Sequence, residues 1–242
     1  MKRIFACLLA VAVSIGAPGV SADELSEADV KRLALEAILE NPEIVMQAVE
    51  ILQQRENQAK AEAVSSVLTD QRGLLERDPN APVIGNPDGD VTVVEFFDYN
   101  CPYCKRAAPV VKSVIGEDSQ LRVVYREWPI LGEGSVFAAR AALAARNQGK
   151  YEEFHWALMD LKGRANEASV MKAARDIGLD EDRLRADMNA PEIDAHIQVS
   201  MNLASQLGFS GTPSFVIGDA LAPGLIPEDE MKRLIKNARD AQ

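Results

Sequence analysis

The spacing of apolar positions along the chain changes near residue 78. Before it, from Ser26 onward, apolar side chains recur every three or four positions, which predicts helices. Ser26 to Asp29 is typical of a capping box that begins the first helix, and Asn41-Pro42 ends it and begins a second. These helices precede any strand signal and have no sheet to cover. Two interpretations stay open: they pack on their own domain, or residues 23–77 form an arm that buries its apolar stripe against copies of itself.

From residue 78 onward, short apolar runs are separated by turns. Val91 to Phe97 predicts a buried strand and Leu121 to Tyr125 a second one, with a helical pattern between them. This order favours a βαβ unit with parallel strands. Residues from about 133 to 207 predict a helical insertion. Three later elements complete the order: a strand from Ser214 to Ile217, a turn-rich region from Asp219 to Gly224, and a helix from Asp229 to Ala241.

The first residues are typical of a secretory signal peptide. Met1 to Arg3 is basic, Ile4 to Ile15 is apolar, and Val20-Ser21-Ala22 resembles a cleavage site. We therefore expect a signal peptide over residues 1–22, which removes Cys7. The remaining chain would be a soluble protein of an exported, oxidising compartment, in which disulfides persist.

Composition narrows the class of protein. The chain has 242 residues, a formal net charge of -11, 47% hydrophobic residues and 26% charged residues, as in ordinary globular proteins. The acidic balance argues against a nucleic-acid partner, because phosphate groups are bound by Lys and Arg. With only 3 cysteines and 2 histidines, thiol, metal or imidazole chemistry is confined to a handful of positions.

The motif from Cys101 to Cys104 follows a predicted strand and begins a predicted helix. At a helix N-terminus, free backbone N–H groups and the macrodipole favour a thiolate, the nucleophilic form of cysteine. Cys104 lies one turn further along the same face, so the two sulfurs can form a reversible bond. Pro102 in the first turn costs little, because its missing N–H would be unpaired there. The motif predicts a redox-active Cys101–Cys104 disulfide and no separate cofactor.

Other uses of the cysteine pair are weighed beside this one. Structural zinc needs four ligands, and after cleavage no second cysteine pair remains, while His155 and His196 lie far along the chain. Neither histidine is assigned a role. A purely structural disulfide over so short a loop gains little stability. Cu(I) capture by Cys101 and Cys104 stays an alternative, because soft thiolates select Cu(I).

Four segments form a pattern far more specific than the cysteine motif alone: Glu95 to Cys104, Tyr125 to Gly132, Gln148 to His155, and Gly211 to Phe215. From about Pro82 onward, the chain resembles DsbA-type thioredoxin-fold proteins, and among them chiefly the periplasmic suppressor-of-copper-sensitivity proteins of the ScsC type. The resemblance implies an α/β protein, a thioredoxin fold with an inserted helical domain at about 133–207, preceded by an N-terminal helical oligomerisation arm. Some ScsC-type proteins form trimers through such helices, so a trimer is favoured.

The resemblance also implies roles for individual residues. Cys101 attacks a substrate disulfide, and Cys104 resolves the mixed disulfide. Glu95 would be a buried acid beneath Cys104 that exchanges a proton with it, although a Glu95 side chain that reaches solvent stays an alternative. Arg126 and Trp128 are candidates to flank the site.

Substrate contacts are implied on two segments of the chain. One is Pro102 and Tyr103 between the cysteines. The other is Thr212-Pro213, where a cis peptide bond would face the cysteines and present the backbone of Thr212 to an extended substrate. From the sequence alone, a cis bond before proline is the minority form.

The chemistry expected is thiol–disulfide exchange on exported, cysteine-containing proteins. Strong oxidants of the family carry His where this chain has Tyr103, and Tyr103 together with Thr212 is more similar to the isomerases. We therefore predict a disulfide isomerase or reductase, kept reduced by a membrane thiol reductase. Two alternatives remain: a dithiol oxidase recharged by a quinone-linked membrane partner, and a Cu(I)-binding protein of copper tolerance.

Overall fold

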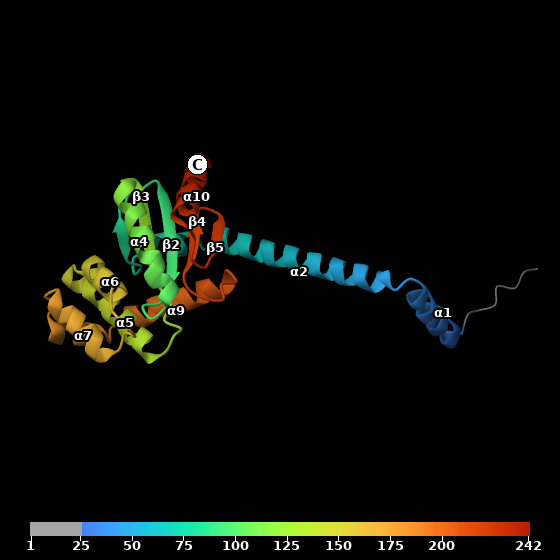
Figure 1. Ribbon diagram of the computed structural model, residues 1–242, viewed down its shortest axis with the longest axis horizontal. Coiled ribbons are helices and arrows are strands. Elements are labelled where there is room, and N and C mark those ends of the chain that lie inside the picture. The colour runs from blue at the N-terminus through green and yellow to red at the C-terminus, as the bar shows by residue number, and fades with distance from the viewer. Residues whose placement is uncertain (1–25) are drawn as a thin grey trace, which may run out of the picture. The chain divides into compact units, whose positions relative to one another are not determined.

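The computed structural model describes residues 26–242. The predicted signal peptide, residues 1–22, and Cys7 lie outside the described residues. The chain divides into two compact units, Met1–Glu56 and Asn57–Gln242, whose elements are labelled in Figure 1. Within residues 26–242, no helix combines the length and the apolar character needed to cross a lipid bilayer.

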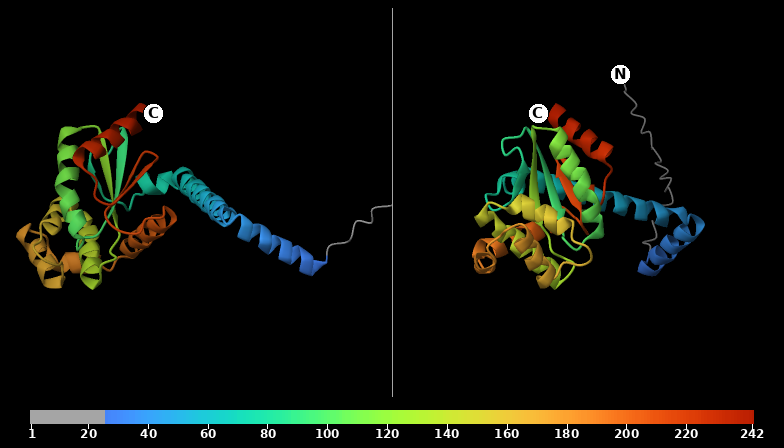
Figure 2. Two further views of the ribbon diagram at one scale, coloured as in Figure 1. Left: turned by 45° about the vertical axis from the view of Figure 1, so that its right-hand side comes forward. Right: turned by 60° about the vertical axis from the view of Figure 1, so that its left-hand side comes forward.

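The centre of the second unit is a five-stranded mixed sheet in the order β1-β3-β2-β4-β5 (Figures 1 and 2). β2 and β3 are parallel, and the other neighbouring strands are antiparallel. Helix α4 (Pro102–Glu117) connects the parallel pair, which confirms the predicted βαβ unit. The strands are β1 (Val83–Gly85), β2 (Val91–Phe97), β3 (Leu121–Glu127), β4 (Ser214–Ile217) and β5 (Ala220–Pro223).

Helices cover both faces of the sheet. Because side chains alternate between the two faces of a strand, each strand contributes residues to two cores. Val93 and Phe97 of β2 belong to a core that includes residues of α4 and α10. Val94 and Phe96 belong to a second core with residues of α3 and α9. β2 and β3 are buried along their whole length, which explains their continuous apolar runs. The bounds of these helices are α3 (Arg72–Arg77), α9 (Pro191–Gln206) and α10 (Glu228–Asp240).

A helical insertion separates β3 from β4, as predicted. Its first helix is rich in alanine and buries Ala138, Ala141 and Ala142 completely, so that neighbouring helices can approach it closely. Figure 1 shows α5, α6 and α7 grouped together at one end of the sheet. Besides α9, the insertion contains α5 (Glu133–Ala145), η1 (Arg146–Gln148), α6 (Tyr151–Met159), α7 (Glu167–Asp176) and α8 (Glu181–Asp187).

Two strands differ from the sequence prediction. β1 was not predicted, and the expected turn-rich region from Asp219 to Gly224 contains β5, paired with β4 in an antiparallel hairpin. β1 has 3 residues and β5 has 4, and both lie at the edges of the sheet. Such short edge strands carry too few alternating positions for a pattern to be visible in the sequence.

The segment before β1 is fixed to the second unit. Leu68, near the end of α2 (Glu43–Asp70), and Leu75 of α3 are buried in the core with α9. Arg126 of β3 forms a buried ion pair with Asp78, Nη1 to Oδ2 2.7 Å, and donates to the carbonyl oxygen of Leu74. The boundary between the units at Glu56 therefore precedes the arm boundary at residue 77 that the sequence suggested.

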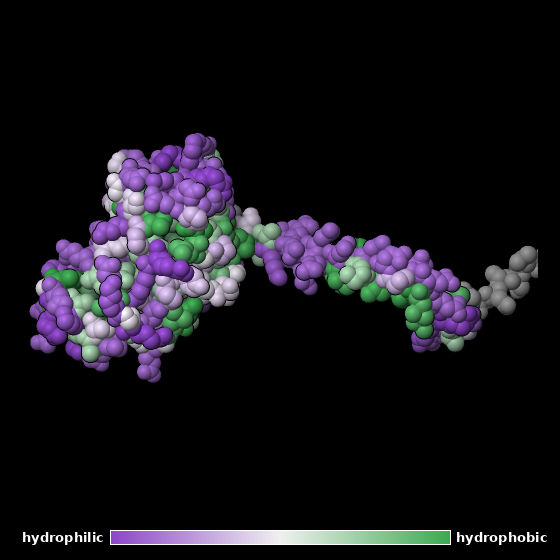
Figure 3. Space-filling view, in the orientation of Figure 1, coloured by the Kyte–Doolittle hydropathy of each residue, from purple (hydrophilic) through white to green (hydrophobic). Residues whose placement is uncertain are grey.

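The first unit contains α1 (Glu27–Glu40) and the beginning of α2. The Ser26 Oγ accepts the Asp29 N–H at 3.2 Å, as the capping box predicted. None of the described α1 side chains is buried. Figure 3 shows apolar side chains gathered over α1 and the first turns of α2. The large exposed apolar side chains of this unit are Val30, Leu33, Leu35, Ile38, Leu39, Ile44, Val45, Met46, Val49, Ile51 and Leu52.

Candidate active site

The two cysteines lie at the beginning of α4, directly after β2. Cys101 is the N-cap residue of α4, and its Sγ accepts the Cys104 N–H at 3.4 Å. Both cysteines are free thiols. Cys101 is 4% exposed and Cys104 is fully buried. Pro102 is the first helical residue, where proline has no backbone hydrogen bond to lose. The sequence-predicted arrangement at the helix start is therefore present.

The surroundings push the proton affinities of the two thiols in opposite directions. The pKa of Cys101 is lowered to about 5, in spite of burial, chiefly by a hydrogen bond from the Cys104 thiol. Further hydrogen bonds come from the Thr212 side chain and from the backbone N–H groups of Cys104 and Tyr103. Burial, the hydrogen bond to Cys101 and the charge of Glu95 raise the pKa of Cys104 far above its usual range. Near neutral pH, Cys101 is therefore the thiolate and Cys104 the proton-bearing thiol.

A loop before β4 faces Cys101. The Thr212-Pro213 peptide bond is cis, as the resemblance implied, and the carbonyl oxygen of Thr212 lies 3.2 Å from Cys101 Sγ. That carbonyl can accept a hydrogen bond only from the thiol form of Cys101. The loop is held by two hydrogen bonds, from Gly224 N–H to Pro213 O at 2.8 Å and from Ser214 Oγ to Gly211 O at 2.7 Å.

Glu95 lies inside the sheet and does not reach solvent. It occupies the middle of β2, in register with Tyr125 of β3 and Phe215 of β4, and is 2% exposed. Among the described residues, its Oε1 has no hydrogen-bond partner. Burial and the nearby negative charge of Cys101 raise the pKa of Glu95 to about 8. A carboxyl group with this proton affinity can exchange a proton near neutral pH, and we retain Glu95 as the proposed proton partner of Cys104.

A groove adjoins the cysteines and the cis-proline loop. Its volume is about 510 Å³, and it is lined by Tyr103, the loop from Ser210 to Ser214, and Leu225. The Tyr103 ring is 52% exposed, and the Arg106 guanidinium carbon lies 4.4 Å from its centroid. Three of the four sequence-predicted substrate residues, Tyr103, Thr212 and Pro213, therefore line a single groove that an extended peptide could enter, and Pro102 is not among its lining residues.

The residues that hold the loop before Cys101 were not predicted from the sequence. Asp98 accepts N–H groups from Asn100 at 2.7 Å and from Leu131 at 2.9 Å. The buried Asn100 accepts the Ala165 N–H at 2.6 Å and donates to Ser135 Oγ at 3.1 Å. The signal available in the sequence was the polar pair Asp98 and Asn100 directly before the motif. Their partners lie far along the chain and could not be identified from it.

Four further residues belong to buried networks: the two histidines that were assigned no role, and the two candidates to flank the site, Arg126 and Trp128. His155 Nδ1 and the Tyr99 hydroxyl share a hydrogen bond at 3.1 Å. Burial lowers the pKa of His155 to about 3, so its imidazole is neutral. His196 Nε2 lies 2.7 Å from Glu127 Oε2. Arg126 is bound to Asp78, and Trp128 packs edge-on against Phe96 at 6.4 Å between centroids. These contacts account for each of the four side chains without placing it at the cysteines.

Over residues 26–242, no cluster of three or more His, Cys, Asp and Glu side chains is arranged to hold a metal ion. Cys101 and Cys104 are the only cysteines in this part of the chain. A copper ion at the site would therefore have two thiolate ligands from one chain.

Comparison with known proteins gives three informative similarities. The model of the DSBA-like thioredoxin domain matches residues 92–236. A thioredoxin-like oxidoreductase from Silicibacter pomeroyi is 61% identical, with a TM-score of 0.70, over 71% of this chain and 99% of that chain. The catalytic domain of Proteus mirabilis ScsC is 28% identical, with a TM-score of 0.66, over 72% of this chain and 98% of that chain.

Among curated sequences, a Na+/H+ antiporter of Salinispora tropica is 30% identical over 166 residues, which are 66% of this chain and 26% of the antiporter. The chain thus spans about a quarter of the length of that curated relative.

Proposed function

The chain belongs to the DSBA-like thioredoxin domain family, and we propose that it is a thiol–disulfide oxidoreductase of the DsbA and ScsC type. The observation that carries this proposal is the opposite tuning of the two thiols. The pKa of Cys101 is about 5, and that of Cys104 is strongly raised. One sulfur is thereby ready to attack, while the other stays protonated until a mixed disulfide has formed.

The proposed reaction begins with the Cys101 thiolate. It attacks one sulfur of a substrate disulfide, forms a new S–S bond and releases the other substrate sulfur as a thiolate. Cys104 then transfers its proton to the Glu95 carboxylate and attacks Cys101. The mixed disulfide breaks, the Cys101–Cys104 disulfide forms, and the substrate leaves with both sulfurs reduced. Two electrons pass from the protein to the substrate, and the oxidation of a substrate follows the same steps in reverse.

Substrate recognition is assigned to the groove beside the cis-proline loop. Its walls are Tyr103, the loop at Thr212 and Pro213, and Leu225. Backbone of the loop would pair with an extended peptide, and recognition through backbone tolerates many sequences. This suits a protein that acts on varied exported proteins with cysteines in the periplasm.

For the direction of the reaction we propose isomerase or reductase activity, with the pair kept reduced by a membrane thiol reductase. Support comes from Tyr103, which offers no cation to the Cys101 thiolate, and from its combination with Thr212. A dithiol oxidase, recharged by a quinone-linked membrane partner, is the second candidate, because a pKa of about 5 at Cys101 stabilises the reduced form. At pH 7, which is about two units above this pKa, the stabilisation of the Cys101 thiolate shifts the reduction potential of the cysteine pair by roughly 60 mV toward the oxidising side.

Oligomerisation through the first unit is part of the isomerase proposal. Eleven large apolar side chains of residues 30–52 are exposed in the single chain, and an apolar surface of this extent marks an interaction site. Association of copies, with a trimer favoured, would bring several cysteine pairs around one substrate.

The test is the reactivation of a protein with scrambled disulfides by the full-length mature chain. Ile38→Glu combined with Val49→Glu places charges on the apolar stripe, and Gln47→Glu combined with Gln54→Glu is the matched control on polar positions. We expect the stripe variant to lose mass per particle and most of its isomerase activity, and the control to keep both. Loss of all activity in Cys101→Ser is expected in either case. Rapid oxidation of a reduced client, with weak reactivation in every variant, would replace the isomerase by the oxidase.

A further inference from the structure

A second cavity lies beside the β1 edge of the sheet and includes neither cysteine among its lining residues. Its volume is about 530 Å³, and three of its lining side chains are Arg77, Arg122 and Arg146. The chain as a whole carries a formal net charge of -11, so three guanidinium groups around one cavity form a local positive patch on an acidic protein. Within residues 26–242, none of the three forms an ion pair with a carboxylate at 4.0 Å or less.

Arg122 is the buried member of this set. It lies on β3, and its side chain points to the same face of the sheet as Val124 and Arg126. It is 6% exposed, and its Nη1 donates to the carbonyl oxygen of Glu76. In the part of the chain that the structure describes, its Nε has no acceptor. A guanidinium has five N–H donors, and a buried charge without a counter-charge is costly.

Arg126 on the same strand shows how this fold satisfies a buried guanidinium. It has both a carboxylate, Asp78 at 2.7 Å, and helix-end carbonyl oxygens as acceptors. Arg122, four residues earlier, has the carbonyl contact and lacks the carboxylate. An anion supplied from outside would complete the same arrangement at Arg122.

The other two arginines differ in how far they are used. Arg146 donates to Asn80 O at 2.5 Å and to Pro79 O at 2.8 Å, which ties that loop to the insertion. Arg77 is exposed and has one long contact, 3.4 Å from Nη1 to Pro87 O. Its guanidinium is therefore free to close on a ligand.

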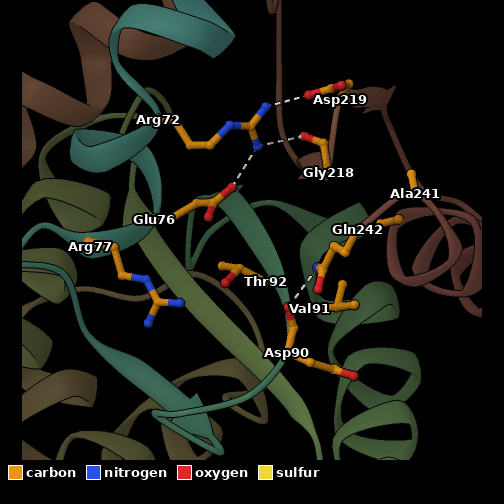
Figure 4. A pocket seen from close by; sticks show the side chains of 11 residues that line it. Arg72, Glu76, Arg77, Asp90, Val91, Thr92, Gly218, Asp219, Ala241 and Gln242 are labelled. Atoms are coloured by element: carbon orange, nitrogen blue, oxygen red, sulfur yellow. Dashed lines mark hydrogen bonds and ion pairs between the residues drawn. The ribbon is translucent and has the colours of Figure 1, made fainter.

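A neighbouring cavity, drawn in Figure 4, provides an internal comparison. It has a volume of about 340 Å³ and shares Arg77. Its own arginine, Arg72, is linked to Glu76, Gly218 and Asp219, whereas no such link reaches Arg77 (Figure 4). Arg72 already has its counter-charges, and so the unsatisfied positive charge lies on the side of Arg77 and Arg122.

Two acidic side chains line the arginine cavity. Asp78 is bound by Arg126, whereas Glu152 is exposed and accepts only a hydrogen bond from Trp156 Nε1, at 3.3 Å. The pKa of Arg122 is lowered by burial and then by the like charge of Arg77, which outweigh the opposing charges of Glu76 and Asp88, so the two guanidiniums repel each other. A ligand with negative charge would reverse this repulsion.

We propose that the cavity formed by Arg77, Arg122 and Arg146 binds a small oxyanion, of the phosphate, sulfate or carboxylate class. Arg122 contributes a fixed positive charge at its base, and Arg77 closes on the ligand from the more exposed side. Binding would strengthen the connection between α3, β1 and β3. It is independent of the cysteine chemistry, and its test requires no measurement of redox activity.

The test compares anions by thermal unfolding of the oxidised full-length mature chain. Sodium phosphate, sodium sulfate and sodium citrate are each compared with sodium chloride at equal ionic strength, and the citrate arm separates an organic carboxylate from an inorganic ion. Because phosphate and sulfate stabilise most proteins generally, the variant Arg77→Gln is measured beside wild type. Arg185→Gln is the matched control, since Arg185 is exposed, pairs with Glu167 and lies outside the cavity.

We expect at least one of the three anions to raise the melting temperature of wild type and Arg185→Gln by several degrees above the chloride value. In Arg77→Gln, the rise should fall to a third or less of that value. Equal rises in all three proteins, or no rise above chloride in wild type, would overturn the proposal. Should Arg77→Gln be unstable in chloride, calorimetric titration of wild type with the same anions decides: no saturable heat also overturns it.

Discussion

The acidity of Cys101 gives the sharpest prediction about the proposed chemistry. Its pKa of about 5 has as its largest cause the hydrogen bond from the Cys104 side chain. Cys104→Ala removes this donor, whereas Cys104→Ser replaces a thiol by a hydroxyl that can still donate. We therefore expect the apparent pKa of Cys101 to increase in the order wild type, Cys104→Ser, Cys104→Ala. Each variant also leaves Cys101 as the single thiol of residues 23–242.

The rate of alkylation by iodoacetamide measures this pKa, because only the thiolate reacts. With a pKa of about 5, Cys101 is roughly 90% thiolate at pH 6, whereas an ordinary cysteine with a pKa of about 8.5 is roughly 0.3% thiolate. The approximately 300-fold excess of thiolate is offset about 25- to 55-fold by the weaker nucleophilicity of an acidic thiol. The net expectation at pH 6 is a rate about five to ten times that of an ordinary cysteine.

At pH 8 the order should reverse. Cys101 is then fully ionised and gains nothing further, while an ordinary cysteine is about one quarter thiolate and intrinsically more nucleophilic. Cys101 in the folded protein should react roughly ten times more slowly than the same protein unfolded in urea, which is the control. A rate for folded wild type that rises continuously from pH 6 to pH 9, parallel to the unfolded control, would refute the assignment of Cys101 as the acidic nucleophile. Equal pKa values in the two Cys104 variants would refute the role given to the Cys104 hydrogen bond.

Three further predictions concern the surroundings of the pair. In wild type, the rate at which Cys104 resolves a mixed disulfide should rise with pH through about 8, the pKa of Glu95. In Glu95→Gln, quenched-flow measurement should show a slower step without this inflection. An unchanged inflection in the variant would contradict the proton transfer. The reduced protein should gain stability relative to the oxidised one as pH rises from about 5 to 8.5, because folding lowers the pKa of the Cys101 thiol and the thiolate then favours the folded state. Urea unfolding of both forms at pH 5, 7 and 8.5 measures this difference in the free energy of unfolding. A difference that does not change with pH would argue against it. Asn100→Ala leaves the buried partners Ala165 and Ser135 unpaired and should lower the free energy of unfolding in urea by about 2–4 kcal/mol. The control Asn202→Ala, at an exposed position, should lower it by less than about 0.5 kcal/mol. Equal effects of the two substitutions would contradict the anchoring role of Asn100.

Local signals in the sequence account for the elements predicted correctly. The capping residue Ser26, the apolar run from Val91 to Phe97 and the strand-to-helix position of Cys101 each depend on neighbours within a few residues. The same holds for the helical insertion, whose periodicity is visible over many turns. The family resemblance added the cis geometry of Thr212-Pro213 and the burial of Glu95, neither of which follows from spacing alone.

Contacts between residues distant in sequence could not be predicted in this way. Asn100 binds Ala165 across 65 positions, and Glu127 binds His196 across the whole insertion. His196 has no partner visible in sequence because its carboxylate lies on a strand at the far side of five helical elements. The edge strand β5 is recognisable only beside β4, with which it pairs.

The charges that form the arginine cavity were also invisible in the sequence. Arg77, Arg122 and Arg146 come from a helix, a strand and a short 3-10 turn. In the sequence, nothing distinguishes any of the three from the other arginines of an acidic chain. Their convergence depends on the pairing of β1 with β3 and on the packing of the insertion against that edge.

The most direct test of the proposed function is the location of the mixed disulfide. Cys104→Ala, Cys101→Ser and wild type are incubated at pH 7 with a peptide that contains one disulfide, quenched with acid and digested for mass spectrometry. We expect a stable peptide adduct on Cys101 in Cys104→Ala, no adduct in Cys101→Ser, and in wild type a reduced peptide with a Cys101–Cys104 disulfide. An adduct on Cys104 in Cys101→Ser, formed as fast as the one on Cys101, would contradict the division of roles between the two cysteines.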